Sequence, residues 1–294
     1  MARFVSYIDD NGGERVAFES GGKAHPLPPG MTMPTLLSLG RKAIACLAGE
    51  AAARPAVGRI GDLRLLPPVT NPGKIICLAG NYQEHIREGG GTAVDKARAT
   101  PHLFIKPRTC LAPPGATVVR SRMTDRLDYE CELAVVIGQT ARDIPESEAL
   151  AAIGGFTIAN DVSSRRLLHD GRDPDAPRSE RERFFDWLVG KWQDGSLPLG
   201  PALVTPDEVG DGSGLRLTLD VNGERRQDGN TSQMIFSVPE IVSFVSRYTT
   251  LEPGDIICTG TCAGVAASSG RYLQPGDQVV GAIEKLGELR FTIG

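Results

Sequence analysis

The most informative stretch of this sequence is Leu127-Asp-Tyr-Glu-Cys-Glu-Leu-Ala-Val-Val-Ile137. Its apolar second half predicts a buried strand. Residues two apart on a strand point to one face, so Glu130 and Glu132 should lie side by side at its start. Two carboxylates on a partly buried face repel each other and lose hydration, so a positive charge should compensate them. A hard divalent cation would do so. An exposed strand end with two solvated glutamates is the alternative that this stretch alone leaves open.

A third acid follows another apolar strand. Phe156-Thr-Ile-Ala-Asn160 runs directly into Asp161, although an aspartate at a strand end is also ordinary turn chemistry. Together, Glu130, Glu132 and Asp161 would form a three-carboxylate site with positions left for water and substrate. Such a ligand set suits Mg²⁺ or Mn²⁺, with Ca²⁺ as a further candidate.

The surrounding sequence predicts a strand-rich α+β protein. Strands do not alternate regularly with long helices, which argues against a doubly wound parallel sheet. One helix is expected after Ser237, which would cap it, with Pro239 in its first turn and Glu240 three residues after the cap. From residue 74 onward the expected strands are Lys74–Ala79, Leu133–Ile137, Phe156–Ala159, Leu215–Val221, Asp255–Cys258 and Gln278–Ile283.

Residues 1–68 are expected to form a small β-rich N-terminal module, and residues 72–294 the larger domain. Proline and glycine punctuate the stretch Pro67–Gly73, which we take as the boundary between them. A helix should begin near Pro34. The two strands expected in the module are Arg3–Ile8 and Glu14–Phe18.

Composition limits the classes of function. The 294 residues carry 32 basic and 36 acidic side chains, and the net charge of −4 argues against a dedicated nucleic-acid binder. No apolar run approaches the roughly 18 residues of a membrane span, and acids stand where a signal peptide needs apolar residues. The six cysteines form no CxxC pair, as expected for reduced thiols. These features predict a cytoplasmic protein without nucleic-acid or membrane partners.

A histidine and a glutamate lie three residues apart in Gly80-Asn-Tyr-Gln-Glu-His-Ile-Arg-Glu-Gly-Gly-Gly91. On a short helix capped by Asn81, His85 and Glu88 would share one face. A glutamate that orients a histidine makes a general-base pair for water. The triple glycine should end the helix and let this segment act as a lid. A surface His–Glu pair is the alternative from local evidence.

Two further segments could contact a substrate. Lys191, which lies among aromatic and glycine residues, could stabilise an oxyanion or enolate, although its neighbours alone favour a solvated loop lysine. The small-residue loop Thr259–Val265 follows a strand and would admit a carboxylate close to the backbone.

Taken in order, these motifs resemble the fumarylacetoacetate hydrolase superfamily over residues 72–294. The resemblance implies a mixed β-sandwich roll, usually in a homodimer. The segments that carry it are KIICLAGNYQEH, HLFIKP, LDYECELAVVIG, GFTIANDVSSR, GKWQDGSLPLGP, VNGERRQDGNTSQMIFSVPEIVSFVS and LEPGDIICTGTCAGV. By resemblance, the metal carboxylates are Glu130, Glu132 and Asp161, the catalytic residues are His85, Glu88 and Lys191, and the substrate-binding residues are Arg165, Thr261 and Lys106.

The resemblance also implies a function. It points to a metal-dependent hydrolase that cleaves a C–C bond in an acylpyruvate or a related diketo acid, a small anionic substrate. A decarboxylase, isomerase or tautomerase of a keto acid is the alternative, and a ligand-binding protein on a retired catalytic fold is a third. Leu168, Trp192 and Cys262 depart from the residues that the family often has, and all three lie where the resemblance places the substrate pocket.

The segment 166–185 carries many charges of both signs and cannot belong to the core. Because it connects Asp161 to Lys191, both of its ends should lie near the active site. We expect it to pack over the pocket mouth or against a dimer partner, with arginines that recruit an anionic substrate. Arg172, Arg178 and Arg181 are the candidates.

Overall fold

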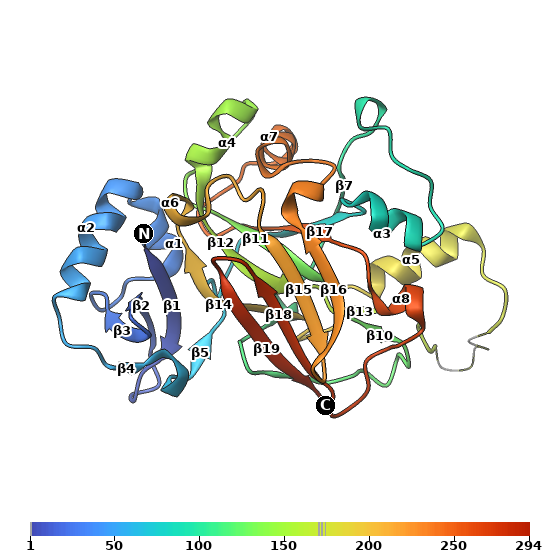
Figure 1. Ribbon diagram of the computed structural model, residues 1–294, viewed down its shortest axis with the longest axis horizontal. Coiled ribbons are helices and arrows are strands. Elements are labelled where there is room, and N and C mark those ends of the chain that lie inside the picture. Colours follow the sequence, from blue (N-terminus) through green and yellow to red (C-terminus); the bar gives the residue numbers. More distant parts are fainter. Residues whose placement is uncertain (1, 170, 172, 174) are drawn as a thin grey trace.

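The computed structural model describes residues 2–169, 171, 173 and 175–294. Within this part of the chain, the strands form a large mixed sheet, a five-stranded sheet and a two-stranded ribbon (Figure 1). This architecture confirms the strand-rich α+β class expected from the sequence. None of the described helices is long and apolar enough to cross a membrane.

The large sheet has the spatial order β4-β3-β2-β1-β14-β12-β11-β17-β6-β7, with β5 beside β1 and β8 beside β14. Its strands are β1 (Arg3–Ile8), β2 (Glu14–Ser20), β3 (Lys23–Pro26), β4 (Gly58–Arg59), β5 (Leu65–Leu66), β6 (Ile75–Ala79), β7 (His102–Ile105), β8 (Leu111–Ala112), β11 (Cys131–Ile137), β12 (Ile153–Asn160), β14 (Leu197–Val204) and β17 (Ile256–Thr261).

The five-stranded sheet has the order β16-β15-β18-β19-β9 and packs against one face of the large sheet. It consists of β9 (Thr117–Val118), β15 (Arg216–Val221), β16 (Glu224–Asn230), β18 (Gln278–Ile283) and β19 (Gly287–Ile293), while the ribbon pairs β10 (Leu127–Asp128) with β13 (Ser163–Ser164).

Both faces of β11 are buried, which explains its uninterrupted apolar sequence. Leu133 belongs to the core on one face, together with Leu217 of the five-stranded sheet. Ala134 belongs to the core on the other face, together with Leu37 of the N-terminal module. Because side chains alternate along a strand, Glu132 emerges on the module-facing side of the sheet.

The N-terminal strands extend the large sheet, since β1 pairs antiparallel with β14. The helix expected near Pro34 is in fact two helices, α1 (Met33–Ser38) and α2 (Arg41–Ala52). Gly40 separates them with a φ of 79°, a left-handed conformation that favours glycine and interrupts the helix. The apolar spacing across both segments is nearly continuous, so the sequence pattern alone did not show the break.

The remaining helices lie in the larger domain. α7 begins after Ser237, whose side chain and that of Glu240 form the expected capping box. α5 (Glu180–Val189) begins within the charged segment 166–185, for which the sequence predicted a loop or an interface-facing segment and no helix. Ser179 and Glu182 form a capping box at its start, a signal that the density of charges obscured. The helices are α3 (Gln83–Glu88), α4 (Glu146–Ala152), α5 (Glu180–Val189), α6 (Pro206–Val209), α7 (Val238–Tyr248) and α8 (Ala266–Ser269).

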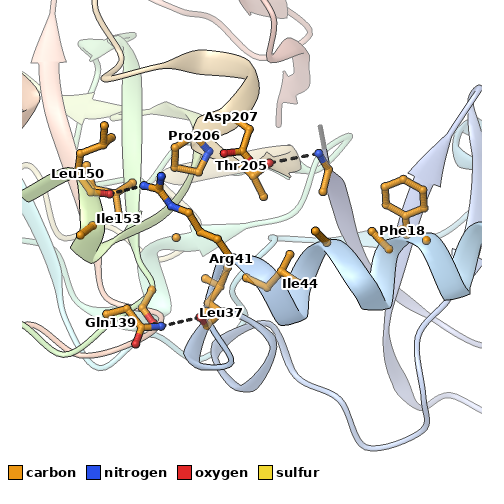
Figure 2. A pocket seen from close by; sticks show the side chains of 18 of the residues that line it. Phe18, Leu37, Arg41, Ile44, Gln139, Leu150, Ile153, Thr205, Pro206 and Asp207 are labelled. Atoms are coloured by element: carbon orange, nitrogen blue, oxygen red, sulfur yellow. Dashed lines mark hydrogen bonds between the residues drawn. The ribbon is translucent and has the colours of Figure 1, made fainter.

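A cavity of about 640 Å³ separates α2 from the larger domain (Figure 2). Ile44 and Ile153 contribute to its apolar wall. Arg41 crosses to the larger domain, where its Nη2 donates to the carbonyl oxygen of Leu150. None of the three predicted metal-ligating acids is among its described lining residues, so this cavity is separate from the site described next.

Candidate metal centre and active site

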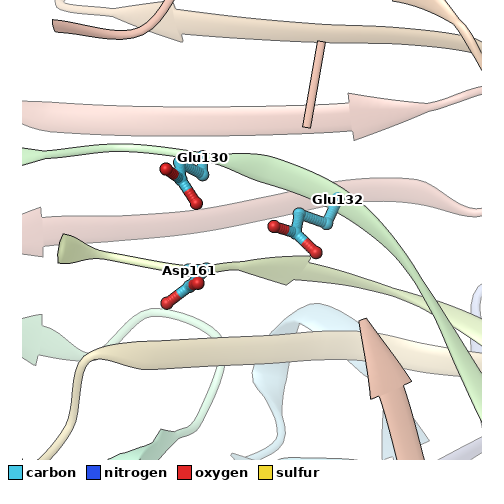
Figure 3. A group of neighbouring side chains, drawn as sticks. All are labelled: Glu130, Glu132 and Asp161. Atoms are coloured by element: carbon cyan, nitrogen blue, oxygen red, sulfur yellow. The ribbon is translucent and has the colours of Figure 1, made fainter. Parts of the chain in front are cut away.

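The three acidic side chains predicted to bind a metal lie together in the structure. Glu130 and Glu132 flank Cys131 at the start of β11, and Asp161 directly follows β12. The two strands are antiparallel neighbours, and the Asp161 amide donates to the Glu130 carbonyl at 2.8 Å. One oxygen of each carboxylate lies within 4.8 Å of the others, and all three residues are buried (Figure 3). Two neighbouring strands therefore direct three oxygen ligands into one small space.

Three cations compensate two of these acids. Lys191 Nζ lies 2.7 Å from Glu130 Oε2 and 2.8 Å from Asp161 Oδ2. Lys106 Nζ lies 2.7 Å from Asp161 Oδ1, and the Arg165 guanidinium donates to Glu130. Although burial opposes the ionisation of Glu130, Lys191 and Arg165 hold its pKa below the ordinary value. The charges of Asp161 and Glu130 raise the pKa of Lys191, although burial alone would lower it.

Among the described residues, Glu132 is the acid of the three that has no cationic partner. Its Oε2 accepts a hydrogen bond of 2.8 Å from the Gly260 amide, and no ion pair to it exists among the described residues. Burial above all, with further contributions from Asp161 and Glu130, raises the pKa of Glu132 well above its usual value. A divalent cation between the three carboxylates would supply the missing positive charge. The residues present therefore fit a hard metal ion.

A small cavity of about 70 Å³ lies beside the acids, and His85 is part of its wall. His85 Nδ1 lies 2.8 Å from Glu88 Oε1, and Glu88 Oε2 accepts from the Gly264 amide at 2.8 Å. Burial would raise the pKa of Glu88, but these hydrogen bonds hold it below the ordinary value. An ionised Glu88 accepts the proton on Nδ1, so Nε2 of His85 keeps its lone pair and can accept a proton from water.

The helix that carries this pair ends as expected but is capped differently. α3 ends at Glu88, immediately before the glycines. The prediction that Asn81 caps α3 was wrong, because Tyr82 occupies the cap position without a side-chain hydrogen bond. The Asn81 side chain instead bonds the backbone of Phe236 and Thr259, and so anchors the segment to the loop before α7 and to β17.

Two predicted substrate-binding residues lie in the cavity wall. Arg165 also donates through Nε to Asp128 Oδ2 at 2.8 Å, and burial of Asp128 raises the pKa of that acid. Thr261 faces the cavity while its Oγ1 donates to the Cys131 carbonyl and accepts from Gln227. Both side chains are therefore held in place before any substrate binds.

Lys106 lies elsewhere than expected. Its side chain is fully buried, and its ammonium bonds Asp161, the Lys191 carbonyl and Ser196 Oγ. All three donors are occupied, and Lys106 is not among the described residues of the cavity wall. This geometry corrects the prediction of a direct substrate contact. Lys106 instead binds Asp161 from outside the cavity.

Replacing Lys106 by Met should lower the free energy of unfolding by about 3–5 kcal/mol, because it removes one partner of a buried ion pair. Chemical denaturation monitored by circular dichroism would measure the loss. Lys96→Met removes the partly exposed pair with Glu240 and should cost at most about 1 kcal/mol. Equal stabilities of the two variants would contradict the role of Lys106.

The arginines predicted to recruit substrate have different surroundings in the structure. Arg178 Nε donates to Asp186 Oδ2 at 3.0 Å, so an acid of α5 compensates its charge. Arg181 lies 5.9 Å from the centre of the Phe185 ring and is not among the described wall residues of any cavity near the acids. Arg172 lies outside the described residues. The expectation that Arg181 faces the pocket is therefore not met.

Two aromatic residues of the site were missed by the sequence analysis. Trp187 of α5 and Phe104 of β7 both line the cavity, and their ring centres are 5.0 Å apart. Lys191 Nζ lies 5.3 Å from the Phe104 ring centre and 5.8 Å from that of Trp187, within the range of cation–π attraction. Only the fold brings these segments together, although a helix assignment from Ser179 and Glu182 would have drawn attention to Trp187.

Comparison with known proteins supports the interpretation of this site. Residues 74–294 match the family described as fumarylacetoacetate (FAA) hydrolase C-terminal. A 2,4-didehydro-3-deoxy-L-rhamnonate hydrolase from Sphingomonas sp. is 40% identical over 233 residues, which are 78% of this chain and 76% of the relative.

Two solved structures are similar to the chain. A probable 2-hydroxyhepta-2,4-diene-1,7-dioate isomerase from Mycobacterium abscessus has a TM-score of 0.79 and 29% identity, covering 99% of this chain and 97% of its own. A fumarylpyruvate hydrolase from Pseudomonas aeruginosa, in complex with Mn²⁺ and pyruvate, has a TM-score of 0.65 and 31% identity, covering 78% and 91%.

Proposed function

The chain belongs to the fumarylacetoacetate hydrolase family, and from this premise we propose that it is a metal-dependent hydrolase of an acylpyruvate or a related diketo acid. The observation that carries the proposal is one small cavity whose wall includes Glu130 and Glu132 of the buried carboxylate group and His85 of the His–Glu pair. The Mn²⁺ and pyruvate of the similar fumarylpyruvate hydrolase support the same combination of metal and keto acid.

Glu130, Glu132 and Asp161 would hold a divalent ion such as Mn²⁺ or Mg²⁺. When bound, the metal would supply Lewis acidity toward the oxygens of the keto acid. Lys191 uses two of its three N–H donors on Glu130 and Asp161. The third can donate to a substrate oxygen on which negative charge develops.

His85 would accept a proton from water through Nε2, with Glu88 stabilising the imidazolium that forms. The activated water would attack the ketone carbon that is remote from the carboxylate. The bond between that carbon and the methylene that separates the two ketones would then break. The bonding electron pair would go to the keto-acid fragment, which takes up one proton. The products would be two acids, with water added across the broken bond.

A panel of acylpyruvates tested with Mn²⁺, with Mg²⁺ and with a chelator would examine the proposal. We expect conversion of at least one compound into two smaller acids, identified by chromatography, and loss of turnover after metal removal. A metal-independent reaction, or no reaction with any diketo acid, would contradict it.

A second function is favoured by the similar dioate isomerase, whose structure covers nearly the whole of both chains. An isomerase, tautomerase or decarboxylase of a keto acid would need the same carboxylates and Lys191, but no attack by water. Appearance of an isomer, or of CO₂, without two acid products would favour this alternative. Incubation in ¹⁸O-labelled water separates the two, because only hydrolysis places the label in a new carboxylate.

We further propose that the protein is a homodimer. Phe184, Phe185 and Val189 of α5 are exposed, as are Leu103 and Ile105 of β7. Phe104 and Trp187 are in contact, so β7 and α5 lie side by side, and we call their exposed apolar residues the α5–β7 patch. β7 is also the last strand of the large sheet. Exposed apolar surface beside an open strand edge is typical of an association site, and most soluble oligomers are symmetric homo-oligomers.

Replacing Phe185 by Glu should convert the dimer into a monomer, because it places a charge in the proposed interface. Sedimentation velocity would measure the mass. Tyr248→Glu alters an exposed aromatic residue on α7, outside the patch, and should leave the dimer intact. A wild-type protein that sediments as a monomer would refute the assignment.

A further inference from the structure

A second hollow adjoins the cavity beside the acids. It has a volume of about 220 Å³, against about 70 Å³ for the first, and Arg165 and Trp187 line both. The smaller space has about a third of the volume of the second hollow. If the keto-acid group of a substrate occupies the smaller cavity, the rest of the molecule would extend past Trp187 into the second hollow.

The wall of this second hollow is rich in guanidinium groups, but most of them have acidic partners. Arg165 donates to Asp128 and Glu130, Arg166 to Asp125 and Asp175, and Arg178 to Asp186. Asp186 and Asp173 are the acids of the wall, and the Oδ1 of Asp173 accepts from the Asp175 amide.

Arg183 differs from these arginines. Its Nη1 donates to the Arg178 carbonyl at 2.8 Å, and it has no carboxylate partner within the described ranges. Within the described residues, this is one bond for five donors, which leaves most of the guanidinium available to bind an anion. The bond to Arg178 also fixes the direction in which the group is held.

The geometry of α5 explains why Arg183 and not Arg181 faces the hollow. Arg183, Asp186 and Trp187 are spaced i, i+3 and i+4, which places them on one helix face, and all three line the hollow. Arg181 and Phe185 are four residues apart on another face, where the guanidinium lies over the ring. The two arginines thus offer a matched pair on the same helix.

We propose that this hollow binds a second carboxylate, at the end of the substrate remote from the three acids, and that Arg183 is the residue that selects it. The preferred substrate class is then a keto acid with two carboxylates. The inference rests on the proposed function only in placing the keto-acid head beside Glu130, Glu132 and Asp161. A planar guanidinium with free donors is suited to bidentate binding of a carboxylate.

Calorimetric titration in a buffer with Mn²⁺ tests the proposal without turnover. Pyruvate carries one carboxylate, whereas 2-oxoglutarate and 2-oxoadipate carry a second one at two distances. We expect at least one diacid to bind the wild-type protein more tightly than pyruvate. Arg183→Gln should weaken binding of that diacid roughly 10- to 100-fold, the range for hydrogen bonds to charged groups, and leave pyruvate unchanged. Arg183→Lys should recover part of the loss.

Arg181→Gln is the matched control and should leave all three affinities unchanged. Diacid binding no tighter than that of pyruvate, or equal losses in the two Gln variants, would overturn the inference. Turnover of acylpyruvates is measured separately. If no acylpyruvate is cleaved while the diacid preference and its dependence on Arg183 persist, the hydrolase proposal fails and the second carboxylate site stands.

Discussion

Replacing Glu132 by Gln should abolish turnover and remove the stabilisation that Mn²⁺ or Mg²⁺ gives to the folded protein. Glu132 is the acid of the three without a cationic partner among the described residues. A bound metal ion would therefore stabilise its ionised form more than that of Glu130 or Asp161. Gln keeps the shape of the side chain and can still accept the Gly260 hydrogen bond. The fold should therefore remain intact while a charged ligand is lost.

Thermal unfolding with and without Mn²⁺ would measure this effect. A ligand at 100 times its dissociation constant stabilises a protein by about 2.7 kcal/mol, and this increment should disappear in the variant. Glu288→Gln, which alters an exposed acid on β19 paired with Arg290, should behave like the wild type. Undiminished metal affinity of Glu132→Gln would show that the ion binds elsewhere.

Replacing His85 by Ala should lower kcat about 10²- to 10⁴-fold, the usual contribution of a general acid–base group. The histidine forms its hydrogen bond with Glu88 and is not one of the three grouped acids, so metal-dependent stabilisation should persist. Steady-state kinetics on a cleaved diketo acid, together with the unfolding assay above, separate the catalytic loss from a metal-binding loss. Glu88→Gln should reduce kcat in the same direction, because it removes the charge that stabilises an imidazolium.

The control for this pair is Glu84→Gln, on the same helix but directed to solvent and paired with Arg87. Its kcat should match that of the wild type. Wild-type kcat in His85→Ala would exclude the histidine as the base. Such a result would favour the isomerase alternative if the reaction product contained no oxygen from water.

Much of the site could be predicted from local sequence because its parts are local. Glu130, Glu132 and Ala134 are spaced two residues apart. Because side chains alternate along a strand, both acids lie on the face of the sheet where Ala134 is buried. His85 and Glu88 share one helical turn, and the structure joins them by a hydrogen bond of 2.8 Å. Residues separated by two to four positions meet wherever the element forms, so their pairing needs no knowledge of the fold.

Other features depended on contacts between distant segments. The sequence cannot show whether Lys106 contacts a substrate or pairs with Asp161. The position of β7 beside β6 shows that it pairs with Asp161. Arg178, Arg181 and Arg183 are indistinguishable by composition. Their different roles come from Asp186, from the Phe185 ring and from the face of α5 that meets the hollow.

From the sequence alone follow the strand-rich class, the three acids, the His–Glu pair and the family resemblance, because periodicity and short motifs encode them. The tertiary structure alone shows that Glu132 has no cationic partner in the part of the chain that the structure describes, that Lys106 is buried beside Asp161 and that Arg183 faces a second hollow. Each of these facts depends on which side chains surround the residue in the folded protein. Those neighbours come from β6, β7, β11, β12 and α5, segments as much as 100 residues apart. Charge compensation depends on distance in space, and the chain reveals those distances only once it is folded.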